Sequence, residues 1–183
     1  MGAIRVHEFI TLGGVIDTPT WTMDFPFDPE MGEAIGGIMG GSGAILLGRR
    51  TFEMFAPAWS TRTSDQDPGA PFMNDTPKYV VGATPASVEW AHSESVGAYD
   101  PVTIQRLKDS VEAGIYVSGS GTLVRAMLAD GLVDELHLFV YPVTVGTGPR
   151  LFPEGASPRR LDLLSCDSYH NGVVHLGYHP AGD

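Results

Sequence analysis

Val117-Ser118-Gly119-Ser120-Gly121-Thr122 joins a short apolar run to a segment with helical character. Residues 115–117 are typical of a buried strand, and residues 123–129 predict a helix that ends near Gly131. The N-terminus of a helix carries unpaired N–H groups and a partial positive charge, and glycine lets a ligand approach the backbone. The stretch is therefore a predicted phosphate-binding turn.

A second stretch, Leu47-Gly48-Arg49-Arg50-Thr51, repeats this order of strand, glycine and helix. Its threonine adds a hydroxyl donor, and Arg49 or Arg50 can pair with a phosphate dianion. Two such turns at the carboxyl ends of parallel strands suit a dinucleotide, which has phosphates in two places. The alternative stays open that glycine serves only the backbone at these turns, because Val124 leaves the G-x-G-x-x-G pattern incomplete.

The order of elements predicts an α/β fold. Asp28-Pro29 and Asp100-Pro101 each combine an N-cap with proline at the first helical position, so a helix is expected after each. Residues 13–27 and 61–76 are predicted loops, and His170-Asn171-Gly172 predicts a hairpin turn. Predicted strands cover residues 4–12, 44–47, 78–81, 115–117, 134–143, 161–169 and 173–179. We expect one domain over residues 1–183, with a mixed, mostly parallel sheet flanked by helices and closed by an antiparallel hairpin.

Composition excludes several classes of protein. The 183 residues hold 11 Lys and Arg against 22 Asp and Glu, a net charge of −11, which disfavours binding to nucleic acid or to an anionic membrane surface. The N-terminus has no secretion signal and no apolar run is long enough to span a membrane, so a cytoplasmic protein is expected. The single cysteine, Cys166, is expected to be a small buried hydrophobic residue in a strand.

The remaining chemistry-bearing side chains give a weaker pattern. His175 and His179 lie four apart on a predicted strand, which separates them along one face, so ordinary strand histidines are favoured and no metal site is predicted. Trp59 and Trp90 are expected in the core. Trp21 lies in an aromatic loop and is the favoured tryptophan for a substrate contact.

The motifs together resemble a known family. Residues 45–53, Ile-Leu-Leu-Gly-Arg-Arg-Thr-Phe-Glu, look like the strand–Gly-Arg-x-Thr–helix segment of the dihydrofolate reductase fold. Further resemblance lies in residues 117–124, 131–136, 142–148 and 151–153. The ordered set is similar to the C-terminal reductase domain of the bifunctional riboflavin-biosynthesis deaminase/reductase and its stand-alone bacterial relatives. It covers essentially the whole chain and implies an NADPH-dependent reductase, commonly a homodimer.

The resemblance also implies roles for individual residues. Arg49 would favour the 2′-phosphate, Gly82 and Thr84 would border the adenosine ribose, and residues 10–16 would lie against the nicotinamide. The implied cofactor-binding residues are Gly48, Arg49, Arg50, Thr51, Gly82, Thr84, Gly119, Ser120, Gly121, Thr122, Leu123 and Ile16. The implied substrate-binding residues are Thr11, Trp21, Phe52, Phe55, Val145 and Gly146.

Two departures from the family pattern leave the reaction open. Gly13 stands where many relatives carry an aspartate that orients substrate. Glu33, or Glu30, falls in the stretch where dihydrofolate reductase has a buried acid, and the alternative is that both are solvated helix carboxylates. One hypothesis is hydride transfer from NADPH to a small heterocycle or carbonyl compound, which is pterin- or ribosylaminopyrimidine-like by resemblance. The other is a non-catalytic NADPH-binding module or redox sensor.

Overall fold

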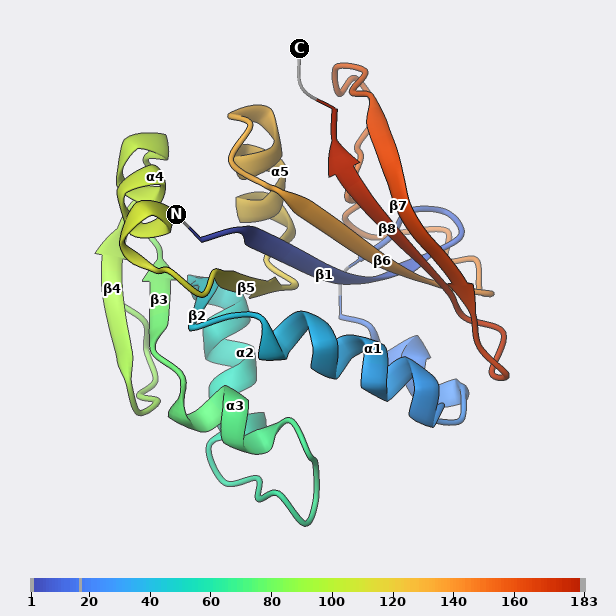
Figure 1. Ribbon diagram of the computed structural model, residues 1–183, viewed down its shortest axis with the longest axis horizontal. Helices are drawn as coiled ribbons and strands as arrows, with labels where there is room; N and C mark the ends of the chain where they lie inside the picture. Colours follow the sequence, from blue (N-terminus) through green and yellow to red (C-terminus); the bar gives the residue numbers. More distant parts are fainter. Residues whose placement is uncertain (1, 17, 182–183) are drawn as a thin grey trace.

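A computed structural model describes residues 2–16 and 18–181, and this part of the chain forms an eight-stranded sheet (Figure 1). The strand order is β4-β3-β2-β5-β1-β6-β8-β7. Strands β1 to β6 are parallel, β8 is antiparallel to β6, and β7 is antiparallel to β8. The strands are β1 (Ile4–Thr11), β2 (Ala44–Gly48), β3 (Lys78–Val81), β4 (Ser93–Gly97), β5 (Ile115–Ser118), β6 (Glu135–Tyr141), β7 (Leu161–Ser168) and β8 (Val174–Pro180). The predicted mixed sheet with a C-terminal antiparallel hairpin is confirmed.

Helices cover both faces of the sheet, as expected from the alternation of strands and helices (Figure 1). Helices α4 (Pro101–Ser110) and α5 (Gly121–Ala129) lie on one face, and α1 (Pro29–Gly40), α2 (Arg49–Trp59) and α3 (Ala70–Asp75) lie on the other. The period of two along each strand separates the two cores: Ile4 and Val6 pack in the cluster of α4 and α5, whereas Leu47 and Phe139 pack in the cluster of α1, α2 and α3. Among the described residues, none of these helices has the length and apolar character needed to cross a bilayer.

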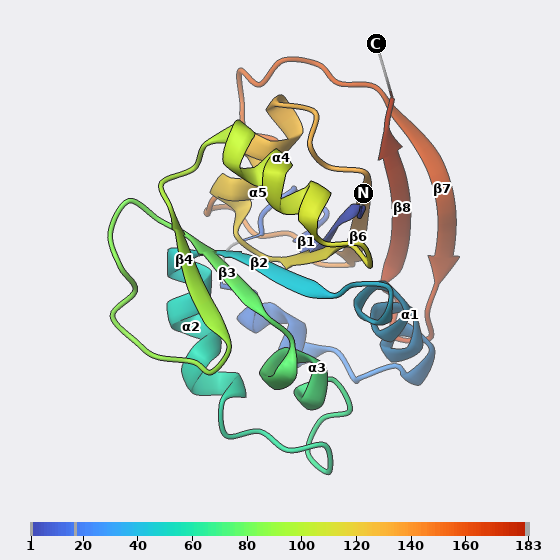
Figure 2. The same cartoon turned by 60° about the vertical axis from the view of Figure 1, so that its left-hand side comes forward.

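Three short elements were not predicted from the sequence. The 3-10 helix η1 (Thr20–Asp24) and helix α3 lie in predicted loops, and no element was predicted at β4. Strand β4 is the edge strand beside β3 (Figure 2). Its residues are almost all exposed. Backbone hydrogen bonds to β3 hold this strand in the sheet. Its sequence therefore lacks the alternation of apolar and polar residues by which a strand is predicted. Helix α3 has six residues and is fixed by the burial of Ala70 and Met73, which only tertiary packing supplies.

One sequence prediction about a single side chain is wrong. Cys166 is exposed, because it lies in β7, the other edge strand of the sheet. Strand β1 ends at Thr11, one residue before its predicted end, and Leu12 is 65% exposed. Trp90 is in the core as expected, and its indole N–H donates to Asn74 Oδ1 at 2.9 Å.

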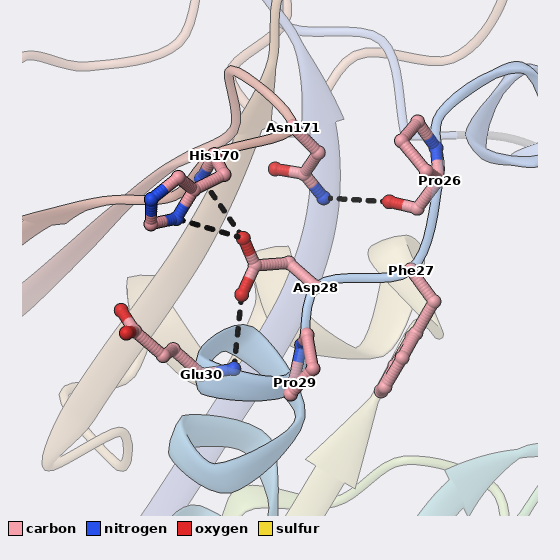
Figure 3. Close-up of a pocket in the computed structure, with 7 residues that line it drawn as sticks. All are labelled: Pro26, Phe27, Asp28, Pro29, Glu30, His170 and Asn171. Carbon is pink, nitrogen blue, oxygen red and sulfur yellow. Dashed lines mark hydrogen bonds and ion pairs between the residues drawn. The ribbon is translucent and has the colours of Figure 1, made fainter.

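Asp28 fastens α1 to the β7–β8 turn (Figure 3). Its Oδ1 accepts the backbone N–H of Glu30 at 2.9 Å, and its Oδ2 accepts that of His170 at 2.8 Å. Desolvation alone would raise the pKa of this carboxyl, but the backbone donors of His170, Met31 and Glu30 outweigh it and hold the pKa below its ordinary value. The prediction that Asp28 caps this helix is thereby confirmed. Its contact with His170 was not predicted from the sequence.

A pocket of about 460 Å³ opens beside this contact (Figure 3). It is lined by Pro26, Phe27, Asp28, Pro29, Glu30, His170 and Asn171. These residues belong to the start of α1 and the β7–β8 turn, so this pocket is separate from the two glycine turns.

Replacement of Asp28 by alanine should lower the Tm more than Asp100→Ala. Both substitutions remove a helix cap, but Asp100 accepts from residues of its own helix, whereas Asp28 also holds His170. Thermal unfolding of the two variants in parallel measures the difference. Equal losses would show that the link to the hairpin contributes nothing to stability.

Candidate cofactor-binding site

The two glycine turns meet at the carboxyl edge of the sheet. Strands β2 and β5 are hydrogen-bonded neighbours, so the segments that follow them leave the sheet side by side. The backbone N–H of Gly48 donates to Ser120 Oγ at 2.9 Å. A Cβ on Gly48 would lie 3.5 Å from Ser120 Cβ, and one on Gly119 would lie 3.3 Å from Thr51 Cγ2. Gly48, Thr51, Gly119 and Ser120 therefore form one continuous surface.

The turn before α5 has an unusual backbone. Gly119 and Ser120 have φ values of 61° and 62°, both in the left-handed region. This conformation costs a non-glycine residue roughly 1–2 kcal/mol. Ser120 occupies the N-cap position of α5 but makes no capping bond, because its hydroxyl accepts from Gly48. The Ser120 hydroxyl thus joins the two turns, and the N-terminus of α5 has no side-chain cap.

Ser120→Ala should destabilise the protein by about 1–2 kcal/mol, because the Gly48 N–H loses its acceptor while the left-handed backbone remains. Ser120→Gly also removes the acceptor, but glycine adopts this backbone freely, so its loss should be smaller. Urea denaturation of both variants measures the two effects. An alanine variant as stable as wild type would contradict the role of this bond.

The loop after β1 closes a third side of the surface. The Ile16 side chain contacts the position that a Cβ on Gly121 would occupy. The backbone N–H of Ile16 donates to the carbonyl of Pro149 at 3.0 Å, which ties this loop to the segment after β6. Val145 lies in the same segment, with its carbonyl oxygen 3.7 Å from a Cβ built on Gly13. Segments from the ends of β1, β2, β5 and β6 are thus adjacent.

Gly82 and Arg49, which the resemblance assigns to the adenosine end, lie together in the structure. Gly82 packs so closely on Arg49 that a Cβ on the glycine would lie 2.8 Å from Arg49 Cβ. Arg49 Nη1 forms an ion pair with Glu53 Oε1 at 3.1 Å, and the same oxygen accepts the backbone N–H of Ser87 at 2.9 Å. Hydrogen bonds from the Ser87 backbone and hydroxyl lower the pKa of Glu53, with a further contribution from Arg49. A phosphate at Arg49 would therefore share the guanidinium with a carboxylate.

Among the residues predicted to bind substrate, Phe52 and Thr11 are placed inside the protein. Phe52 is 2% exposed and packs on Trp90, because the inward face of α2 carries it into the core. Thr11 is also 2% exposed, and its hydroxyl accepts the backbone N–H of Val15 at 3.0 Å. Trp21 remains at the edge of an aromatic cluster, 5.2 Å from Tyr141 and at an angle of 70° to it.

The other predicted substrate residues lie near the surface. Phe55 and Val145 are half-buried, and Gly146 is exposed. Glu33 is exposed on α1, in agreement with the interpretation of this residue as a solvated helix carboxylate.

The comparison with known proteins assigns the family. The RibD C-terminal domain family matches residues 3–175. The chain belongs to this family. In the RibD C-terminal domain described here, the matched region contains both glycine turns and all of β1 to β6.

Relatives of this RibD C-terminal domain include the uncharacterized protein YyaP of Bacillus subtilis, 25% identical over 176 residues, or 93% of this chain and 90% of YyaP. A solved deaminase/reductase from Thermotoga maritima has a TM-score of 0.69 and 14% identity, covering 98% of this chain and 57% of that one. Dihydrofolate reductase from Enterococcus faecalis, solved with NADP(H), has a TM-score of 0.60 and 14% identity, covering 99% and 98%. The predicted dihydrofolate reductase-like fold is confirmed.

The protein also contains a buried acid that the sequence did not single out as a candidate. Glu8, in β1, is 2% exposed, and its Oε1 has no hydrogen-bond partner within the described residues. Burial raises the pKa of this carboxyl to about 8, and the charge of Arg125 opposes the shift only in part. The signal was present in the sequence, because Glu8 lies in phase with Val6 and Ile10 on the buried face of a predicted strand.

Glu8→Gln should become progressively more stable than wild type as the pH rises from about 4.5 to 8. The folded pKa lies above the ordinary one, so wild type loses stability over this window while glutamine does not ionise. The stability difference should grow by about 3 kcal/mol between pH 4 and pH 7. Urea denaturation at several pH values checks this, with exposed Glu112→Gln as the control. A difference that does not change with pH would show that Glu8 is not held in its neutral form.

Proposed function

We propose that this protein is an NADPH-dependent reductase that transfers a hydride to a small heterocyclic or carbonyl substrate. The observation that carries the proposal is the pair of joined turns. Helices α2 and α5 both begin there, and neither N-terminus has a side-chain cap, whereas α1 and α4 are capped by Asp28 and Asp100. Uncapped N–H groups, reinforced by the helix dipole, suit the phosphates of a dinucleotide.

The residues present fit such a cofactor in a consistent order. Gly119, Ser120 and the first turn of α5 would hold the pyrophosphate. Arg49 would hold the 2′-phosphate, with Gly82 beside it where the two residues already pack together. The end of β1 and Ile16 would lie against the nicotinamide. When bound, the cofactor supplies the hydride, and the protein supplies its position and electrostatic surroundings.

The substrate would lie toward the aromatic cluster on the opposite face of the sheet from α5. Phe9, Trp21 and Phe25 surround Tyr141 there. The Trp21 indole N–H is buried without a partner within the described residues, so it can donate to a polar atom of a flat heterocycle. This placement supports a pterin- or pyrimidine-like substrate. Water can deliver the proton that accompanies the hydride.

A second candidate function is a non-catalytic NADPH-binding module. Gly13 in place of the family aspartate and the exposure of Glu33 favour it, because both weaken the substrate side while leaving the turns intact. Turnover separates the two functions. Loss of NADPH absorbance with a pterin, pyrimidine or carbonyl compound would establish the reductase, whereas binding without turnover across the panel would favour the module.

Wild-type protein should bind NADPH more tightly than NADH, and Arg49→Ala should reduce this preference. Removing a charge-assisted contact to the 2′-phosphate costs roughly 1.5–3 kcal/mol, or about 10- to 100-fold in NADPH affinity, with a smaller effect on NADH. Quenching of tryptophan fluorescence measures both constants.

The control is Arg106→Ala, which removes an exposed arginine of α4, a helix that contains no residue of either glycine turn. Equal losses for NADPH and NADH in Arg49→Ala would place Arg49 away from the 2′-phosphate. Absence of binding to either cofactor by wild type would overturn the proposed function.

A further inference from the structure

We infer that His137 and His175 form a pH-sensitive latch, which holds residues 20–28 closed at neutral pH and releases them in mild acid. The two imidazoles lie on adjacent strands, β6 and β8, and are 9% and 5% exposed. The inference is independent of the proposed cofactor, because it concerns the β7–β8 hairpin and the loop before α1.

The hydrogen bonds of the latch run in one direction. His137 Nε2 lies 3.1 Å from Glu135 Oε2, and because a carboxylate only accepts, this nitrogen carries the proton. The other nitrogen of a neutral ring is an acceptor, so His175 Nε2–H donates to His137 Nδ1 across 3.0 Å. His175 Nδ1 then accepts from the Tyr169 hydroxyl at 3.5 Å. While both rings are neutral, each of their nitrogens has a partner.

Protonation acts on this chain in two unequal steps. A first proton can be held on His175 Nδ1, which lies 3.8 Å from Asp167 Oδ2, because His137 Nδ1 still accepts from His175. A second proton, on His137 Nδ1, places two N–H groups and two positive charges against each other. The bond between the rings cannot survive this second step.

The direction of the pH effect follows from the surroundings of His175. Burial lowers the pKa of this ring, the charge of His137 lowers it further, and Asp167 opposes both. Because the folded pKa lies below the ordinary histidine pKa of about 6.5, protons favour the open form as the pH falls through that value. Above it, the latch is closed.

The neighbouring strands bring three further titratable groups to the latch. On β1, His7 pairs in register with His137, but burial and the charges of the two latch rings lower the pKa of His7 to about 3. Glu135 is held by Arg5, whose Nε lies 3.3 Å from Oε2. Further along β8, His179 is exposed, so solvent screens its charge. His7 therefore stays neutral over the range in which the latch opens.

Helix α1 and the β7–β8 turn add mainly acidic groups. Desolvation of Asp28 is outweighed by its backbone donors, so its pKa lies below the ordinary value and it stays ionised in mild acid. Glu30 and Glu33 are exposed. The His170 ring lies 3.8 Å from Asp28 Oδ2, so its protonation would strengthen that contact. Burial and nearby carboxylates raise the pKa of Tyr169, which stays a neutral donor. Titration of these groups therefore does not release the loop.

The latch reaches the loop through the β7–β8 turn (Figure 3). Tyr169 ends the hydrogen-bond chain, and the next two residues hold the segment before α1. The His170 backbone N–H donates to Asp28 Oδ2 at 2.8 Å. Asn171 Nδ2 donates to the Pro26 carbonyl at 3.1 Å. Movement of the turn therefore acts directly on residues 26–28.

The same segment covers the aromatic cluster. Trp21 and Phe25 pack on Tyr141 with ring centroids 5.2 and 5.3 Å away. Strand β7 is at the edge and pairs with β8, so the hairpin joins the rest of the sheet through the β6–β8 ladder (Figure 1). It can therefore shift while the parallel strands stay in place. Opening of the latch in acid would loosen the cover of Tyr141.

Hydrogen exchange of residues 20–28 and 169–173 at about pH 7.5 and about pH 5, corrected for intrinsic rates, tests the latch. Wild-type protection should fall by about tenfold or more at the lower pH, the effect of one lost hydrogen bond. In His137→Asn the amide oxygen still accepts from His175 but binds no proton, so protection should be the same at both pH values. His92→Asn, which replaces an exposed histidine just before β4, is the matched control and should behave as wild type.

Nitrogen chemical shifts of the two rings in the wild-type protein give a second measurement that needs no variant. At about pH 7.5 both rings should carry their proton on Nε2. Unchanged wild-type protection at the lower pH would overturn the inference, as would a loss that persists in His137→Asn or two charged rings in an unchanged hairpin. If His137→Asn does not fold, His175→Gln, whose amide nitrogen replaces Nε2, takes its place. If neither variant folds, the ring titration of wild type decides.

Discussion

The hydrogen bond from the Gly48 backbone to the Ser120 hydroxyl is the contact on which the candidate site depends. It crosses 72 residues of sequence and joins two turns that each lead from a buried strand into a helix. To make it, Ser120 takes a left-handed backbone and leaves the N-terminus of α5 without a side-chain cap. The same bond therefore joins the N-termini of two helices, and α2 also begins without a side-chain cap because its N-cap residue is Gly48.

The helices differ in whether a side chain caps their N-terminus. Asp28 and Asp100 satisfy the free N–H groups of α1 and α4 from within the chain. A carboxylate at a helix N-terminus stabilises the helix and also repels anions. Before α2 the N-cap residue is Gly48, which has no side chain. Before α5 it is Ser120, whose hydroxyl accepts from Gly48 and does not cap the helix. Helices α2 and α5 thus begin without a side-chain cap, as does the six-residue α3, whereas α1 and α4 are closed by their own carboxylates.

Burial of an ionisable group is the second constraint. Glu8 interrupts an otherwise apolar face of β1, between Val6 and Ile10, in the central part of the sheet. The free energy of burying a carboxyl group is tolerated because it stays neutral, at a price in stability that grows with pH. A residue that lowers the stability of the free protein in this way is typical of a functional site.

Apart from η1, α3 and β4, the sequence by itself determined the strand and helix order, the capped starts of α1 and α4, the C-terminal hairpin and the family, because these depend on local periodicity, turn residues and ordered motifs. Only the tertiary structure decided the edge strand β4, the exposure of Cys166 and the burial of Phe52, since each depends on which neighbours pack against it. The residues of the two glycine turns could be named from the sequence, but not the bond that joins them. Glu8 was visible as a charge at a buried position, yet its missing partner is a property of the packed interior and has no local sequence signal.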